Sequence, residues 1–285
     1  VGFGVALVLL FILISFIGSP GGYQIGSTVT IPKGFTVAEA GALLKENRII
    51  RSAGVFSLFA RIFNADGGVL AGTYAFPKQE NVITVAFRLA RGSTGLPPVK
   101  VTIPEGSTAR EIGVILKSSL GDFDALTFQD KARKYEGYLF PETYFFFPGV
   151  APDSVIEAMR STFDESVGPL QRDIEASGRP LSDVVIMASL LEKEARQTET
   201  RRIVAGILWK RLDDDFPLQV DAVFGYIFDR DTYSPSFDDL EVDSPYNTYV
   251  NPGLPPTPIS GVRLASLVAA SDWADTEYLF YVLTG

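Results

Sequence analysis

The sequence predicts an α+β protein with three parts: an N-terminal single transmembrane helix, a small αβ subdomain and a larger mixed α/β domain. Residues 1–17 form an apolar run without charge, and a 17-residue pattern occurs twice, at 29–45 and 101–117. A third stretch, 184–191, is apolar apart from one serine, which predicts a buried helix. From these observations we place the parts at 1–22, 23–98 and 99–285.

The composition excludes several classes of chemistry. The chain has 285 residues, 46% of them apolar, and its 25 Lys and Arg against 34 Asp and Glu give a net charge of −9. Such a charge argues against a nucleic-acid partner. The sequence contains no Cys and no His, which excludes disulfides, Ser-His-Asp hydrolysis and metal sites built on thiolate or imidazole. We expect no metal and no cofactor, and proton transfer through Asp, Glu, Tyr or Lys.

The apolar run at 1–17 has the length of a short membrane span, since about 20 helical residues cross a bilayer. A signal peptide is the main alternative, but Gly18, Ser19 and Pro20 make a poor cleavage site. A buried core helix fits the Gly- and Pro-containing linker less well. We therefore expect an uncleaved membrane anchor, shortened at its N-terminus because the chain does not begin with Met.

The repeated pattern predicts a strand, a Pro-x-Gly turn and a capped helix in each copy. The two copies are offset by 72 residues and agree at 10 of 17 positions. Thr36 with Glu39, and Thr108 with Glu111, have the spacing of capping boxes. Between the copies the pattern predicts further elements: a helix at 52–65, a strand at 73–76, a helix at 82–91 and a linker at 92–98. This region resembles a LysM-like subdomain, with a generic αβ spacer as the alternative.

The helix expected at 181–196 carries the main candidate for acid chemistry. Ser182 or Asp183 can cap its start. Glu192 falls on the edge of the apolar face, near the helix end, and Glu194 lies about 200° further round. Burial disfavours a charged carboxylate, so we expect the pKa of Glu192 to be shifted upward. A carboxylic acid kept protonated near neutral pH is what glycoside cleavage needs as a general acid. An ion pair with Arg196, four residues on, is the alternative.

Three further segments supply candidate ligand-binding residues. The stretch 135–147 holds seven aromatic residues together with Glu136 and Glu142, although most rings of its Phe run are expected in the core. Residues 218–222 read as extended, which places two polar side chains on one side. The Pro-rich loop at 244–259 presents two more, or it is a rigid connection without a ligand. The candidates of these last two segments are Gln219, Asp221, Tyr246 and Asn247.

Four segments of the sequence form a specific combination. They are EGYLFPETY at 136–144, ASLLEKEA at 188–195, LQVD at 218–221, and SPYNTY at 244–249 followed by GLPP at 253–256. Together these segments resemble the endolytic murein transglycosylases, the MltG/YceG-like family, whose order and spacing they match along the chain.

The resemblance implies a membrane-anchored bacterial enzyme on the extracytoplasmic side, with Glu192 catalytic. It implies cleavage of the MurNAc-β-1,4-GlcNAc bond within nascent peptidoglycan strands, and a partnership with penicillin-binding proteins. The family normally continues past Gly285, so we expect a catalytic domain truncated at its C-terminus. The apolar stretch 278–285 reads as a buried strand followed by a turn.

Lytic transglycosylases form a 1,6-anhydro product with one carboxylate, whereas hydrolases of glycosides use two. A muramidase-type hydrolase with Asp221 or Glu142 as second carboxylate is therefore one alternative. The other is a non-catalytic, membrane-tethered glycan-binding scaffold.

Overall fold

The structure, a computed structural model, describes residues 16–63, 69–230 and 234–282. The chain divides into two compact units, one comprising the described residues up to Val99 together with Phe145–Val150, the other Lys100–Tyr144 and Ala151 onward. The architecture is mixed α/β, with many helices and two small sheets. Among the described residues, no helix has both the length and the apolar character needed to span a bilayer. Most of the anchor expected at 1–22 falls on residues 1–15, which lie outside the described ranges.

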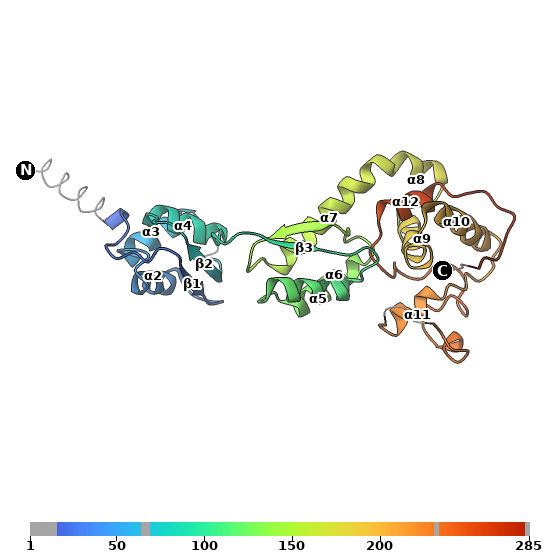
Figure 1. Ribbon diagram of the computed structural model, residues 1–285, viewed down its shortest axis with the longest axis horizontal. Coiled ribbons are helices and arrows are strands. Elements are labelled where there is room, and N and C mark those ends of the chain that lie inside the picture. The colour runs from blue at the N-terminus through green and yellow to red at the C-terminus, as the bar shows by residue number, and fades with distance from the viewer. Residues whose placement is uncertain (1–15, 64–68, 231–233, 283–285) are drawn as a thin grey trace, which may run out of the picture. The chain divides into compact units, whose positions relative to one another are not determined.

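The first unit is built from two strands and three helices. Strands β1 (Ser27–Ile31) and β2 (Gly72–Phe76) pair antiparallel, with Ser27 opposite Phe76. The helices between and after them are α2 (Val37–Glu46), α3 (Ala53–Phe63) and α4 (Val82–Arg91). They bury an apolar core that includes Leu44, Phe56, Tyr74 and Leu89. Figure 1 shows these elements in blue to blue-green.

The second unit contains most of the helices and most of the second sheet, although Val99, Phe145 and Phe146 of that sheet belong to the first unit. Its first part comprises β3 (Val99–Thr102), α5 (Ala109–Leu120), α6 (Ala125–Ala132), the 3₁₀ turn η1 (Arg133–Tyr135), β4 (Thr143–Phe146) and α7 (Pro152–Val167). Strands β3 and β4 are hydrogen-bonded neighbours. Its second part comprises η2 (Gly168–Leu170), α8 (Gln171–Ser177), α9 (Leu181–Glu194), α10 (Thr198–Asp213), α11 (Ala222–Ile227), η3 (Asp239–Glu241) and α12 (Leu264–Ser271).

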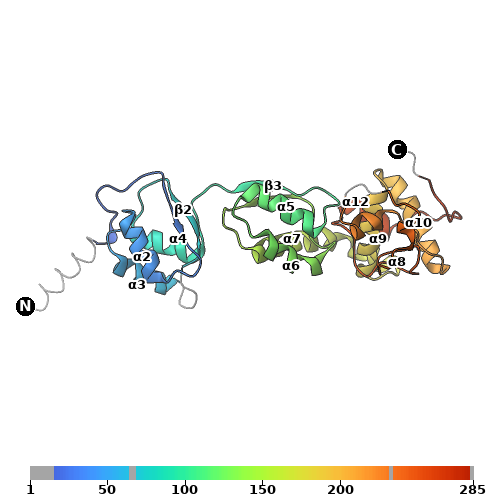
Figure 2. The same ribbon diagram turned by 90° about the horizontal axis from the view of Figure 1, so that it is seen from below.

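Helix α9 is the centre of the second unit. Its residues from Val184 to Leu191 are almost all buried, because α10, α11 and α12 contact it from several sides. Figures 1 and 2 both show α9 beside α10 and α12. The surrounding core includes Leu208, Trp209, Phe224 and Leu267. A helix that is apolar on all sides belongs in such a position. Its polar C-terminal turn is therefore held at a fixed place at the edge of the core.

Both predicted capping boxes are present. The backbone N–H of Glu39 donates to Thr36 Oγ1 at 3.2 Å, and the Thr36 N–H donates to the Glu39 carboxylate at 2.8 Å. Thr108 and Glu111 repeat this geometry at the start of α5. Each box satisfies two N–H groups that a helix start leaves without a partner. The beginnings of α2 and α5 were thus readable from sequence.

Two local predictions were wrong. Helix α9 starts after Pro180, without a side-chain cap from Ser182 or Asp183. Residues 278–282 form no strand, and Tyr278 and Phe280 are about 70% exposed (71% and 67%). A strand needs a hydrogen-bonded neighbour, whereas the carbonyl of Leu279 accepts a hydrogen bond from the side chain of Arg211.

Candidate active site

The second unit encloses a cavity of about 680 Å³, which is within the usual range for binding sites. Its walls come from the start of α5, from α6 and η1, from the C-terminal turn of α9, and from the region of α11. The acidic residues that line it include Glu136, Glu194 and Asp221, and the aromatic ones include Tyr226 and Tyr246. The cavity therefore combines carboxylates and aromatic rings, which suits a carbohydrate-like ligand.

Glu194 is the last residue of α9 and lies in the wall of this cavity. One carboxylate oxygen accepts a hydrogen bond from the backbone N–H of Ala222 at 3.4 Å, and the other accepts from Tyr281 Oη at 3.3 Å. Burial raises the pKa of Glu194, the negative charge of Asp221 raises it further, and the two hydrogen bonds oppose this shift. A carboxyl with a raised pKa in a cavity has the properties of a general acid.

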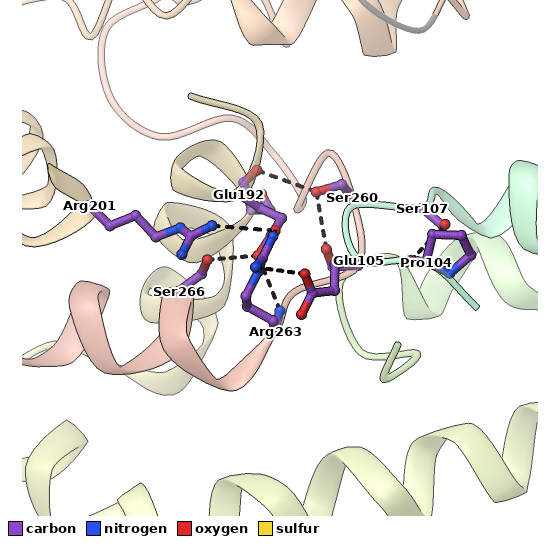
Figure 3. Close-up of polar contacts among 10 residues, drawn as sticks. Pro104, Glu105, Ser107, Glu192, Arg201, Ser260, Arg263 and Ser266 are labelled. Carbon is purple, nitrogen blue, oxygen red and sulfur yellow. Dashed lines mark hydrogen bonds and ion pairs between the residues drawn. The ribbon is translucent and has the colours of Figure 1, made fainter. Parts of the chain in front are cut away.

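Glu192 lies in different surroundings, and it is not among the residues that line the cavity. Its side chain is only 2% exposed and forms an ion pair of 2.6 Å with Arg263. Ser266 donates a further hydrogen bond at 2.7 Å, and a guanidinium nitrogen of Arg201 is 3.9 Å away (Figure 3). The expected burial is therefore present, but the carboxylate is paired with cations. Its partners are on α10 and at the start of α12, and Arg196, the alternative partner, is not one of them.

Glu136 is 6% exposed and lines the same cavity. Its carboxylate accepts a hydrogen bond from the backbone N–H of Ala109, the first residue of α5, at 3.0 Å. Burial is the main reason why the pKa of Glu136 is raised to about 7, and the Ala109 hydrogen bond acts against the shift. Glu136 thus fixes the start of α5 and places a second titratable group at the cavity.

Asp221 lines the cavity as well, and Tyr249 Oη donates a hydrogen bond of 2.6 Å to it. Burial raises the pKa of Tyr249, and the bonded Asp221 raises it further. The prediction that Gln219 shares a side with Asp221 on an extended segment is wrong. Gln219 has a φ of +47°, and Asp221 is helical and precedes α11. Gln219 is not among the residues that line the cavity.

Tyr246 lines the cavity, as a binding residue should. Its ring packs at 5.0 Å from that of Tyr226, and its hydroxyl is 2.7 Å from the Thr257 hydroxyl. Tyr226 was not a sequence candidate. Burial raises the pKa of Tyr226, and the nearby charge of Glu136 adds to the shift. The two rings form an aromatic wall of the cavity that the acidic groups also line.

The structure places two other candidates away from the cavity. Asn247 is fully buried, and its amide donates to the carbonyls of Leu240 and Val242, both at 2.9 Å. Its carbonyl oxygen accepts a hydrogen bond from the N–H of Tyr249. The polar atoms of this side chain therefore bind the loop itself, and few hydrogen-bonding positions remain for a ligand. Glu142 is exposed, precedes β4 and accepts a hydrogen bond from the N–H of Thr143.

Within the described ranges, no three acidic side chains lie close enough together to hold a metal ion. The expectation of a reaction without metal or cofactor stays a prediction.

Comparisons with known proteins agree with the sequence resemblance. The chain is 28% identical over 281 residues to the endolytic murein transglycosylase of Bacillus subtilis (strain 168), covering 89% of this chain and 78% of that protein. It is also 28% identical over 296 residues to the endolytic murein transglycosylase of Streptococcus pneumoniae serotype 2. That match covers 90% of this chain and 54% of the relative, so the chain spans about half the length of the streptococcal protein.

A solved structure has the same fold. The crystal structure of a putative YceG-like protein from Listeria monocytogenes matches with a TM-score of 0.60 and 27% sequence identity, covering 90% of this chain and 93% of that one. A model of the YceG-like family matches residues 29–285, which include all of the second unit and most of the first. The chain therefore belongs to the YceG-like family.

Proposed function

We propose that the protein cleaves glycan strands of peptidoglycan from within, as an endolytic transglycosylase. The chain is an enzyme of the lytic transglycosylase class. It belongs to the YceG-like family, and several of its relatives are named endolytic murein transglycosylase. The substrate bond we propose is the MurNAc-β-1,4-GlcNAc linkage. The observation that supports this best is a partly buried carboxyl of raised pKa, Glu194, in the wall of a cavity lined by tyrosines.

We assign the role of general acid and base to Glu194, rather than to Glu192 as the sequence suggested. A proton donor must reach the bond that it cleaves. Glu194 lines the cavity, whereas both carboxylate oxygens of Glu192 are occupied by Arg263 and Ser266.

In the proposed reaction, Glu194 first donates its proton to the glycosidic oxygen as the bond to the anomeric carbon of MurNAc breaks. The GlcNAc side leaves as an alcohol, and positive charge develops on the MurNAc ring. The resulting Glu194 carboxylate then accepts the proton of the MurNAc C6 hydroxyl, whose oxygen bonds to the anomeric carbon. The product is a 1,6-anhydro sugar, no water is consumed, and Glu194 returns to its protonated form.

Neighbouring residues support each step. Asp221 shares the cavity, and its charge helps to keep Glu194 protonated before the reaction. The same charge favours the positive ring of the transition state. Tyr281 donates a hydrogen bond to Glu194 and so stabilises the carboxylate that forms after proton transfer. The aromatic wall of Tyr226 and Tyr246 offers ring faces for the sugars.

A muramidase-type hydrolase is the second candidate, because Asp221 and Glu194 line one cavity as a pair of carboxylates would. Glu142 lies outside that cavity and does not fit the role of second carboxylate. The two reactions differ by one water in the product. A mass spectrum of peptidoglycan fragments released by the purified protein distinguishes them: anhydro ends support the transglycosylase, and reducing ends support the hydrolase.

The cellular setting is part of the proposal. The apolar run at 1–17 supports a single-pass membrane anchor. The extracytoplasmic side is proposed for the catalytic unit because its proposed substrate, peptidoglycan, lies there. We propose penicillin-binding proteins as partners, since an enzyme that cuts nascent strands must meet the enzymes that make them. Residues 23–98, which belong to the first unit, would form the LysM-like subdomain of this arrangement. Fractionation of cell membranes, with and without residues 1–22, tests the anchor.

A further inference from the structure

Arg263 joins two carboxylates that lie far apart in the sequence. Its Nη2 is 2.6 Å from Glu192 Oε1, and its Nη1 is 2.6 Å from Glu105 Oε2 (Figure 3). The Glu192 side chain is 2% exposed, whereas those of Arg263 and Glu105 are 30% and 47% exposed. The contact therefore runs from the interior to the surface, and its inner half is removed from water.

The second oxygen of Glu192 binds the start of α12. Glu192 Oε2 accepts hydrogen bonds from Ser266 Oγ at 2.7 Å and from the backbone N–H of Arg263 at 3.3 Å. The N-terminus of a helix favours a negative group, both through its N–H donors and through its dipole. Glu192 thus fastens the C-terminal turn of α9, which carries Glu194 two residues later, to α12.

The outer carboxylate belongs to the turn that leads into α5. Gly106 has a φ of +74°, and a Cβ placed on it would lie 3.6 Å from Glu192 Cγ, so this turn packs directly on Glu192. The carbonyl of Ser107 accepts a hydrogen bond of 2.9 Å from the N–H of Gly261. The following residues, Thr108 to Glu111, line the cavity. The network therefore connects two walls of the cavity, the one with Glu194 and the one formed by α5.

The sequence repeat shows that Glu105 is not required by the turn itself. The first copy has Lys33 where the second has Glu105, while both copies keep the proline before it and the glycine after it. Gly34 and Gly106 have similar φ values of +86° and +74°. The backbone geometry is thus the same with either charge. The carboxylate of Glu105 forms its ion pair with Arg263, which lies in the second unit.

We propose that Glu192 and Glu105, joined through Arg263, are positioning residues that hold Glu194 and the start of α5 in their catalytic arrangement. This inference rests on the proposed role of Glu194. Catalysis depends on placing the acid within hydrogen-bond reach of the glycosidic oxygen, and a displacement of about 1 Å can reduce the rate about 100-fold. Loss of the network should therefore lower kcat more than it changes KM.

The test uses the half-exposed Glu105, because its replacement removes neither Glu192 nor Arg263. In the full chain, Glu105→Lys introduces the residue of the first copy and repels Arg263. We expect kcat on soluble glycan strands to fall about 10- to 100-fold, with KM within about 2-fold and an unchanged thermal midpoint. Glu105→Asp keeps the carboxylate and should recover most of kcat. Glu142→Gln, at an exposed glutamate outside the cavity, is the matched control.

An unchanged kcat in folded Glu105→Lys would overturn the inference, and so would a loss carried by KM alone. If Glu105→Lys does not fold, the same comparison of kcat and KM is made with Glu105→Gln. Glu194→Gln, measured in parallel, separates the two proposals. Activity in Glu194→Gln contradicts the proposed function, whereas an inactive Glu194→Gln beside a fully active Glu105→Lys contradicts the positioning role alone.

Discussion

Glu194 and Tyr281 are 87 positions apart in the chain, and the tyrosine hydroxyl lies 3.3 Å from the glutamate carboxylate. Burial raises the pKa of both groups, and each also responds to the other's charge or hydrogen bond. The hydrogen bond from Tyr281 favours the Glu194 carboxylate, whereas the charge of Asp221 disfavours it. Burial thus raises the proton affinity of the proposed catalytic acid, and Tyr281 and Asp221 adjust it in opposite directions.

This relationship predicts opposite pH shifts for two variants. Since the acid must be protonated to act, kcat/KM should fall as the pH rises through the raised pKa of Glu194. Tyr281→Phe removes a hydrogen bond to the charged form, so this fall should move to higher pH. Asp221→Asn removes a repelling charge, so the fall should move to lower pH. pH–rate profiles on soluble glycan strands measure both shifts, and shifts of the same sign in both variants would count against Glu194 as the acid.

Glu136 should make the stability of the protein depend on pH. Its pKa is raised from the reference value of 4.5 to about 7, mainly by burial, so the folded state binds its proton more tightly than the unfolded state does. The stabilisation is complete below about pH 4.5 and is lost as the pH rises through about 7. The shift corresponds to about 3 kcal/mol. Urea unfolding at several pH values measures the loss.

Glu136→Gln is the matched comparison, because its amide oxygen can still accept the Ala109 N–H without titrating. The free energy of unfolding of this variant should fall less between pH 5 and pH 8 than that of the wild type. Equal slopes for the two proteins would mean that Glu136 titrates normally in the folded state.

Glu192→Gln should destabilise the protein, although the change is nearly isosteric. The substitution leaves Arg263 and the buried Arg201 without the carboxylate that pairs with them. Breaking a buried ion pair from one side costs about 3 kcal/mol or more. Chemical unfolding at neutral pH checks this, with Glu194→Gln as the control that removes no ion pair. A Glu192→Gln protein as stable as the wild type would contradict the ion pair with Arg263.

Asn247→Ala should affect stability and not substrate affinity. The side chain is fully buried and makes hydrogen bonds to Leu240, Val242 and Tyr249 within its own loop. Each buried group that loses its partner costs about 1–3 kcal/mol. We expect a lower thermal midpoint and, at a temperature where the variant is folded, an unchanged KM. A KM raised at least 10-fold in folded Asn247→Ala would instead favour the binding role that the sequence suggested.

The local features of the fold followed from sequence because their causes are local. The capping boxes at Thr36 and Thr108 depend on residues three positions apart, and α4 ends at a glycine with a φ of +69°. The path of residues 218–222 was missed because the left-handed φ of Gln219 and the hydrogen bond from its N–H to Thr248 come from a loop 29 positions later.

The sequence predicted the candidate site only in part, again because contacts between segments far apart in the chain determine it. The helical pattern correctly placed Glu192 and Glu194 on different faces of one helix, but it favoured the glutamate nearer the apolar face. That face is covered by α12, whose Arg263 is 71 positions away in the sequence and pairs with Glu192. Glu194 faces a cavity that exists only after α5, α9 and α11 have come together. The feature of the sequence that could have indicated the site is Glu194 itself, a charged residue at the end of an apolar helix and two positions after Glu192.

The most direct test of the account is a mass spectrum of the peptidoglycan fragments released by the wild type, Glu194→Gln and Glu192→Gln, each shown to be folded. We predict fragments with 1,6-anhydro ends from the wild type and a loss of about 10²–10⁴-fold or more in Glu194→Gln, since one residue makes both proton transfers. Glu192→Gln should retain more activity than Glu194→Gln. Anhydro fragments at a near-normal rate from Glu194→Gln, and none from Glu192→Gln, would contradict the account and return the catalytic role to Glu192.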